Sequence, residues 1–135
     1  MKIAFGTDDV TPVTKELVSS LQALGHEVTV YGDGLRWADV GLAVGEAVAS
    51  GQAGAGIVMC FTGTGVSIAA NKVPGVRAAL CAEAETARDA RRWNDANVLA
   101  LALRTTTLDV GLDIIEAFLG NAPDGTEADQ IALLP

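Results

Sequence analysis

Residues 55–66, AGIVMCFTGTGV, decide the fold of this chain. The apolar run from Ala55 to Cys60 predicts a buried strand, and Gly63 and Gly65 predict the tight turn that follows it. The amphipathic pattern after this turn predicts a short helix that begins at about Gly65. A buried strand that passes through a glycine turn into a helix is half of a βαβ unit, so the stretch favours an α/β fold.

The rest of the chain repeats this alternation of short apolar runs and longer amphipathic ones. Strands that alternate with helices predict a parallel sheet with helices on both faces. We therefore expect a single domain over residues 1–135, with a three-layer, Rossmann-like, doubly wound fold and five parallel strands in the order 2-1-3-4-5. The predicted strands are Lys2–Gly6, Glu27–Tyr31, Ala55–Cys60, Val76–Cys81 and Asn97–Leu103; the predicted helices are Thr11–Leu24, Asp39–Ser50, Gly65–Lys72, Ala84–Trp93 and Leu108–Leu119, with one more short helix in the tail 121–135.

Composition excludes several classes of function. The formal net charge is −8, so phosphate backbones and anionic membrane surfaces are disfavoured partners. No apolar run approaches the roughly 20 residues that a membrane-spanning helix needs. The segment Met1–Gly6 resembles a strand and not a signal peptide, so we expect a cytoplasmic protein.

The chain has two cysteines and one histidine, and they do not form a metal-ligand pattern. We expect no disulfide between Cys60 and Cys81, because cytoplasmic thiols stay reduced. Cys81 fits a small buried hydrophobic residue. His26 lies in a predicted loop at the edge of the sheet where the strands begin. A single histidine in such a place removes most catalytic schemes that depend on imidazole.

Polar residues follow the first and third predicted strands. In the predicted strand order, the ligand crevice lies beyond the carboxyl ends of these two strands. Strand one ends in Asp8 and Asp9, which are candidates for binding hydroxyl groups or sharing in proton transfer. The alternative is that these two carboxylates cap the helix that starts at Thr11.

The segment after strand three is the stronger signal. Gly63 and Gly65 allow several N–H groups of the loop Thr62–Gly65 to point into one space, at the positive N-terminus of the next helix. Such a nest binds a phosphate or an enolate oxygen. The same surroundings favour the thiolate form of a cysteine, so Cys60 is a candidate base for a carbon-bound proton. The alternatives are a capped strand-to-helix turn and a buried small hydrophobic residue.

The chain resembles the family of type B ribose-5-phosphate isomerases and galactose-6-phosphate isomerase subunits. The resemblance rests on Cys60 together with the run 71–80, NKVPGVRAAL, and on the run 93–99, WNDANVL, with the later Arg104. The opening 2–8, KIAFGTD, and the helix end 117–120, AFLG, match in the same order. The resemblance therefore covers almost the whole chain.

The resemblance implies a function and a set of roles. The family interconverts aldose and ketose phosphates through a cis-enediolate without a metal or cofactor, in homodimers or dimers of dimers whose active sites are shared between subunits. It implies that Cys60 moves the proton, that Thr62 assists, and that the backbone of Gly63, Thr64 and Gly65 holds the enediolate. Asp8 would bind substrate hydroxyls, and Asn94 would contact the substrate.

The chain also departs from the family pattern. Asp9 replaces a histidine that helps to bind phosphate, Trp93 replaces the ring-opening histidine, and Phe61 replaces a glycine. The tail segment 125–131, GTEADQI, has no arginine where the family carries a phosphate clamp. One like charge at about 4 Å costs on the order of 4 kcal/mol, so these changes should remove phosphate affinity unless Arg104 or Lys72 compensates.

These observations lead to one leading hypothesis and two alternatives. The leading hypothesis is an isomerase in which Cys60 shuttles a proton on a small polyol or hydroxycarbonyl compound other than plain ribose 5-phosphate. This substrate is open-chain or opens by itself, and an unphosphorylated compound or one with an apolar or basic group fits the changed site. Phe61, Trp37 and Trp93 add apolar surface to the pocket, or else the tryptophans pack in the core or a dimer interface. One alternative is an ordinary sugar-phosphate isomerase whose phosphate site is rebuilt from Arg104, Lys72 or Arg36. The other is a non-catalytic partner subunit.

Overall fold

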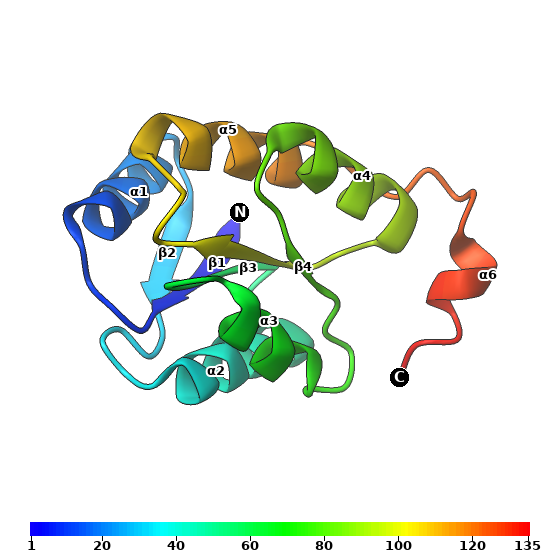
Figure 1. Cartoon of the computed structure of the whole chain (residues 1–135). Coiled ribbons are helices and arrows are strands. Elements are labelled where there is room, and N and C mark those ends of the chain that lie inside the picture. The colour runs from blue at the N-terminus through cyan, green and yellow to red at the C-terminus, as the bar shows by residue number, and fades with distance from the viewer.

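The computed structural model describes residues 1–135 as one α/β domain with three layers (Figure 1). Five parallel strands form the middle layer. The strands are β1 (Lys2–Thr7), β2 (Glu27–Val30), β3 (Ala55–Cys60), β4 (Ala78–Leu80) and β5 (Val98–Ala102); the helices are α1 (Pro12–Ala23), α2 (Trp37–Ala49), α3 (Thr64–Asn71), α4 (Ala84–Asn94), α5 (Leu108–Leu119) and α6 (Ala128–Ile131). The predicted fold class is confirmed, and so is the short helix in the tail.

The predicted strand order is wrong in one detail. The observed order is β2-β1-β3-β5-β4, so β5 and not β4 lies beside β3. The reason is burial: four residues of β5 are fully enclosed, whereas β4 has three residues, all of them at least partly exposed. A short, partly exposed strand suits the edge of a sheet. The crevice between β1 and β3 is unaffected by this exchange.

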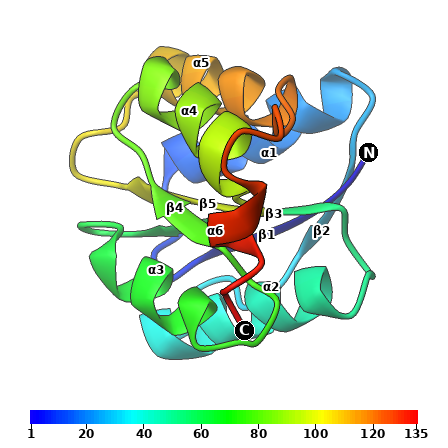
Figure 2. The same cartoon turned by 90° about the vertical axis from the view of Figure 1, so that its right-hand side faces the viewer.

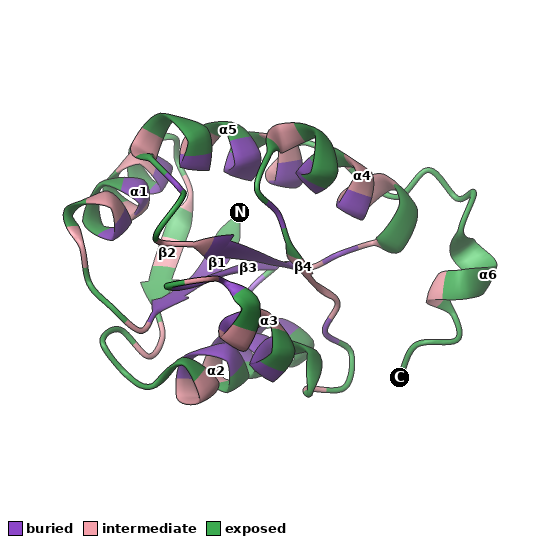
Figure 3. Ribbon diagram, viewed as in Figure 1, coloured by how far each residue is buried: buried purple, intermediate pink, exposed green.

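Two helical layers cover the sheet. The helices α1, α4 and α5 cover one face, and α2 and α3 cover the other (Figure 1). Side chains alternate between the two faces along each strand, so Phe5 joins the first core and Ala4 the second. The buried sides of the helices face the sheet in Figure 3. Cys81 lies in the first core and Cys60 in the second, so the sheet separates the two free thiols.

The first helix is capped by its own residues. The Thr11 side chain accepts a hydrogen bond from the Thr14 amide at 3.2 Å, and the Thr14 hydroxyl accepts one from the Thr11 amide at 2.9 Å. This reciprocal capping box satisfies the start of α1. Neither Asp8 nor Asp9 caps the helix, so the capping alternative for these two carboxylates is wrong.

The tail stands apart from the body. Figure 2 shows α6 and the C-terminus passing in front of the sheet edge. Asp124 holds the start of the tail through Arg92, and the Gly75 amide donates to the Pro135 carbonyl at 3.1 Å. None of the helices has both the length and the apolar character that crossing a membrane requires.

Candidate active site

The carboxyl ends of β1 and β3 meet at one cavity. The Asp8 amide donates a hydrogen bond to the Met59 carbonyl at 3.2 Å, which joins the loop after β1 to the end of β3. The resulting cavity has a volume of about 320 Å³. Its lining combines a thiol, a carboxylate, hydroxyls and aromatic rings: Asp8, Trp37, Cys60, Phe61, Thr62, Thr64 and Gly65.

Cys60 is the last residue of β3 and lines this cavity. The residue is only 3% exposed, because its backbone and part of its side chain pack in the core under α2 and α3. A substrate in the cavity therefore meets a thiol that bulk water scarcely reaches. Cys81 is buried as well, but it lines no cavity, and burial raises its pKa to about 11. The prediction that Cys81 is a buried hydrophobic residue agrees with this placement.

The loop after Cys60 contains unpaired backbone amides. Gly63 has φ +75°, a left-handed conformation, and serves as the N-cap of α3. The amides of Gly63 and Gly65 donate no hydrogen bond within the chain. The Thr62 and Thr64 hydroxyls lie 2.6 Å apart and share one hydrogen bond. Free amides at the start of an eight-residue helix suit an anionic oxygen.

Two aromatic side chains shape the cavity. The Trp37 ring lies over Gly65, where a Cβ atom would approach the ring to 2.8 Å. Gly65 is therefore required for the loop to pass under the ring. Phe61 lines the cavity as well and is 64% exposed. Of the three aromatic residues expected to add apolar surface, Trp37 and Phe61 line the cavity and Trp93 does not.

Asp8 is the carboxylate of the cavity. Partial burial raises the pKa of Asp8 above its ordinary value, and the neighbouring Asp9 carboxylate raises it further. Asp9 is exposed and does not line the cavity, and the Thr7 hydroxyl donates to its backbone carbonyl at 2.7 Å. The structure therefore separates the two acids, and Asp8 is the one that lines the cavity.

Replacing Asp8 with asparagine should trade stability against activity. The raised pKa means that the folded state holds the Asp8 proton more tightly than the unfolded state, so wild-type stability falls as pH rises through this range. We expect Asp8→Asn to raise Tm at neutral pH and to leave it unchanged at about pH 3. Loss of a charged acceptor should lower kcat/KM by about 10- to 100-fold. Thermal melts at both pH values, with kinetics, check this; a lower Tm at neutral pH would contradict it.

Arg104 does not line the cavity, but its side chain contacts Phe61, which does. Its guanidinium carbon is 5.7 Å from the centre of the Phe61 ring. Of the two other basic candidates, Arg36 forms an ion pair with Asp39 at 2.8 Å. Lys72 lies at the far end of α3, about 12 Å along the helix from the loop. Arg104 is therefore the cation best placed for an anionic group on a ligand.

Trp93 and Asn94 lie away from this cavity. They end α4, just before β5 begins at Val98. Val98 pairs with Gly56, and Ala102 pairs with Cys60. Trp93 and Asn94 therefore lie near the end of the sheet where the strands begin, about 13 Å along the strand direction from Cys60. Asn94 lines a second cavity of about 440 Å³ that also includes Arg77 and Pro135. A single chain does not bring Asn94 to Cys60.

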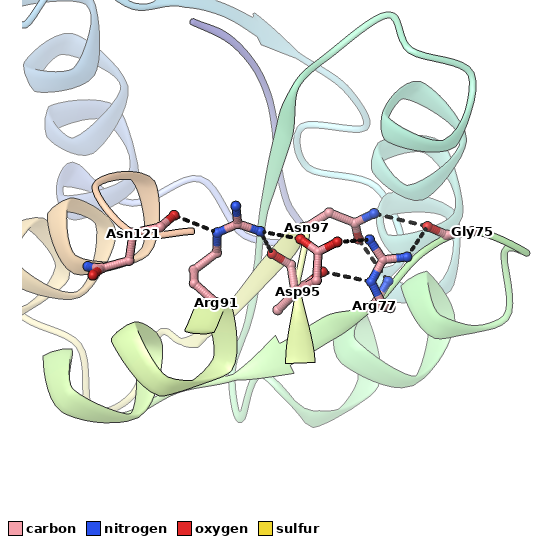
Figure 4. Close-up of polar contacts among 7 residues, drawn as sticks. Gly75, Arg77, Arg91, Asp95, Asn97 and Asn121 are labelled. Carbon is pink, nitrogen blue, oxygen red and sulfur yellow. Dashed lines mark hydrogen bonds and ion pairs between the residues drawn. The ribbon is translucent and has the colours of Figure 1, made fainter. Parts of the chain in front are cut away.

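A network of charges fixes the turn after Asn94. Figure 4 shows Asp95 between two arginines, with Arg77 at 3.2 Å and Arg91 at 3.0 Å. Asp95 has φ +47°, and it is the only residue other than glycine with a positive φ. The Asn97 side chain donates to the Gly75 carbonyl at 2.9 Å, which ties this turn to the preceding loop (Figure 4). These contacts thus fix the turn that directly follows Trp93 and Asn94.

Comparison with known proteins places the site in context. The family model described as Ribose/Galactose Isomerase matches residues 3–133. Ribose-5-phosphate isomerase B of Escherichia coli (strain K12) is 40% identical over 134 residues, which cover 96% of this chain and 90% of that protein. D-erythrulose-4-phosphate isomerase of Pectobacterium atrosepticum is 36% identical over 125 residues, covering 88% of this chain and 82% of that protein.

A solved structure agrees with these relatives. Ribose-5-phosphate isomerase B of Clostridium thermocellum superimposes with a TM-score of 0.93 at 42% identity, over 98% of this chain and 93% of that one. The likeness extends over the sheet and the helices on both of its faces. The family resemblance read from the sequence is therefore confirmed.

Proposed function

Since this chain belongs to the ribose/galactose isomerase family and its named relatives are sugar-phosphate isomerases, we propose that it interconverts the aldose and ketose forms of a short, open-chain sugar phosphate, with Cys60 as the base. The observation that carries this proposal is the cavity in which Cys60 lies beside Asp8 and the loop of free amides. The reaction is an internal redox exchange between two carbons, so it needs no external electron donor.

The proton transfer can be followed atom by atom. Deprotonated Cys60 takes the proton from the carbon next to the carbonyl, so a C–H bond breaks, an S–H bond forms, and the electron pair remains in an enediolate. One hydroxyl proton moves between the two enediol oxygens, and the Thr62–Thr64 hydroxyl pair is placed to carry it. Cys60 then returns its proton to the neighbouring carbon, which completes the isomerisation.

The loop amides supply the electrostatic part of the catalysis. Negative charge moves onto oxygen as the enediolate forms. The amides of Gly63 and Gly65 can donate to this oxygen without breaking a hydrogen bond within the chain. Asp8 accepts hydrogen bonds from hydroxyls further along the chain of the substrate, which fixes its direction in the cavity. Each group lies on a strand end or a helix start, so the site is held by regular structure.

The shape of the substrate follows from what the site lacks. Trp93 stands where the family resemblance places a ring-opening histidine, so a substrate that is already open suits this chain. The relative from Pectobacterium atrosepticum is named for erythrulose 4-phosphate. A four-carbon ketose is too short to close a five-membered ring, and in the matching aldose the phosphate blocks O4, so both forms stay open. We propose that this chain takes a sugar phosphate of that acyclic class, with Arg104 facing the phosphate.

A substrate series tests the proposal. We expect kcat/KM for erythrulose 4-phosphate to exceed that for ribose 5-phosphate by at least about tenfold, because a positioned ring-opening acid contributes about 10²- to 10⁴-fold and this chain lacks one. Ribose 5-phosphate is the second candidate, favoured by the 40% identity to the Escherichia coli enzyme, and equal or faster turnover of it would replace the acyclic assignment. Absence of turnover with every aldose and ketose phosphate would contradict an isomerase and support a non-catalytic subunit.

We also propose that the enzyme is a homodimer with shared active sites. Asn94, expected to touch the substrate, lies at the opposite end of the sheet from Cys60 within one chain. A second copy related by a two-fold axis can bring its Asn94 to the first copy's cavity, and the same operation completes the other site. The rigid turn around Asp95 suits such a contact.

Mixing two inactive variants tests the shared site. Cys60→Ser and Asn94→Ala should each have low activity alone, and hybrids formed after joint refolding should regain about a quarter of wild-type activity, since half of the dimers carry one intact site. Each variant refolded alone serves as the control. No recovery in a mixture shown to contain hybrids would mean that each site is built from one chain.

We place the enzyme in the cytoplasm as part of the same proposal. Both cysteines are free and are separated by the sheet, which suits a compartment that keeps thiols reduced. Fractionation of cells that express the chain tests this location, and recovery from an oxidising compartment would contradict it.

A further inference from the structure

We propose that Phe61 is a positioning residue that holds the Arg104 guanidinium at the rim of the cavity, ready for the phosphate of the substrate. The inference rests on the proposed function and adds to it the source of phosphate recognition. It starts from a difference among the phenylalanines: Phe61 is 64% exposed, whereas Phe5 and Phe118 are fully buried. A phenylalanine left in solvent beside a catalytic thiol calls for an explanation.

The backbone brings the two residues together. The Leu103 amide donates to the Cys60 carbonyl at 2.9 Å, and the Arg104 amide donates to the Phe61 carbonyl at 3.1 Å. These bonds extend the pairing of β3 with β5 past the ends of both strands. The register of the sheet therefore sets Arg104 beside Phe61, and the guanidinium carbon lies 5.7 Å from the ring centre.

The cation–π contact leaves the donors of Arg104 free. Arg77 and Arg91 give their guanidinium groups to Asp95 and to backbone carbonyls, and Arg36 pairs with Asp39. The Arg104 side chain has neither an ion pair nor a hydrogen bond within the chain. An aromatic face attracts the cation without using its N–H groups, so all five remain for an anion. A carboxylate partner would have neutralised the charge.

Phe61 touches both the cavity and the cation. The ring lines the cavity that holds Cys60, and its contact with Arg104 places a positive charge at the edge of the same cavity. The tail segment 125–131 supplies two acids and no arginine, so it offers no second clamp. One pre-oriented guanidinium then carries the phosphate contact, and a bidentate Arg–phosphate pair is strong enough for that role.

A double-mutant cycle with two substrates tests the inference. We expect Phe61→Leu to raise KM for erythrulose 4-phosphate by about threefold to tenfold, with kcat within about twofold, since that is the value of a partly desolvated cation–π contact. KM for unphosphorylated erythrulose should stay constant. Phe61→Tyr keeps the aromatic face and should reverse most of the rise in KM that is expected for Phe61→Leu. In an Arg104→Gln background, Phe61→Leu should have no further effect.

Two results would overturn the inference. An equal rise in KM for both substrates would make Phe61 only a wall of the cavity. Full additivity of Phe61→Leu and Arg104→Gln would show that the ring does not act through the guanidinium.

A binding measurement separates this inference from the proposed chemistry. Calorimetric titration with erythronate 4-phosphate, a compound that has no carbonyl to isomerise, reports phosphate recognition without turnover. Weaker binding in Phe61→Leu, abolished in Arg104→Gln, supports the inference even if no isomerase activity is found. Unchanged binding in Phe61→Leu refutes it even if the isomerase activity is confirmed.

Discussion

Cys60→Ser is expected to lower kcat by about 10³-fold, within the range that general acid–base catalysts contribute. Serine has nearly the shape of cysteine, so the buried packing at the end of β3 is kept. A hydroxyl holds its proton far more tightly than a thiol does, so the variant cannot form the base at neutral pH. KM should change little, because the hydroxyl-binding Asp8 and the loop amides remain.

The matched control is Cys81→Ser. This residue is buried at the end of β4 on the other face of the sheet, and burial raises its pKa to about 11. The substitution should cost some stability, because it buries a hydroxyl in an apolar core, but kcat should stay near that of the wild type. Full activity in Cys60→Ser would contradict a role of the Cys60 thiolate as the base. An equal loss in both variants would indicate damage to the fold.

The fold could be predicted from the sequence except at one edge of the sheet. The alternation of short apolar runs with amphipathic ones specifies parallel strands and two helical layers, and these are observed. The order of β4 and β5 could not be predicted, because the segments 76–81 and 97–103 are both short apolar runs in the sequence. Leu80 at the end of β4 is exposed, as expected for an edge strand, but this exposure depends on the tertiary structure and is not visible in the sequence.

The candidate site could be predicted in part for a similar reason. Cys60, Thr62 and Gly65 are close in sequence, and topology alone brings Asp8 to them. Side-chain contacts between different elements could not be predicted. Nothing in the sequence shows that Trp37 covers Gly65 or that Arg104 stacks on Phe61. These contacts join residues that are distant in sequence, and no local pattern encodes them. Asn94 lies far from Cys60 because α4 returns the chain to the end of the sheet where the parallel strand β5 begins.

Gly63→Ala is expected to damage both the catalytic loop and the fold. Gly63 has φ +75°, which costs an alanine about 1–2 kcal/mol. A Cβ atom at this position would also lie 2.5 Å from Leu80 and 3.0 Å from the backbone of Leu101. The loop must move to relieve these contacts, so its amides would leave the enediolate. We expect kcat to fall by about 10²- to 10³-fold, as when an oxyanion donor is lost, and stability to fall by about 3 kcal/mol.

Gly25→Ala separates the two causes. Gly25 has φ +94°, but a Cβ atom there would have no neighbour within 4 Å. This control should lose only the backbone strain of about 1–2 kcal/mol in urea unfolding, with kcat unchanged. If Gly63→Ala kept wild-type kcat, measured below its Tm on protein with native circular dichroism, the amides of this loop would not hold the developing charge. The catalytic effect of Cys60 would then need another source of electrostatic support, and Asp8, itself an anion, cannot provide it.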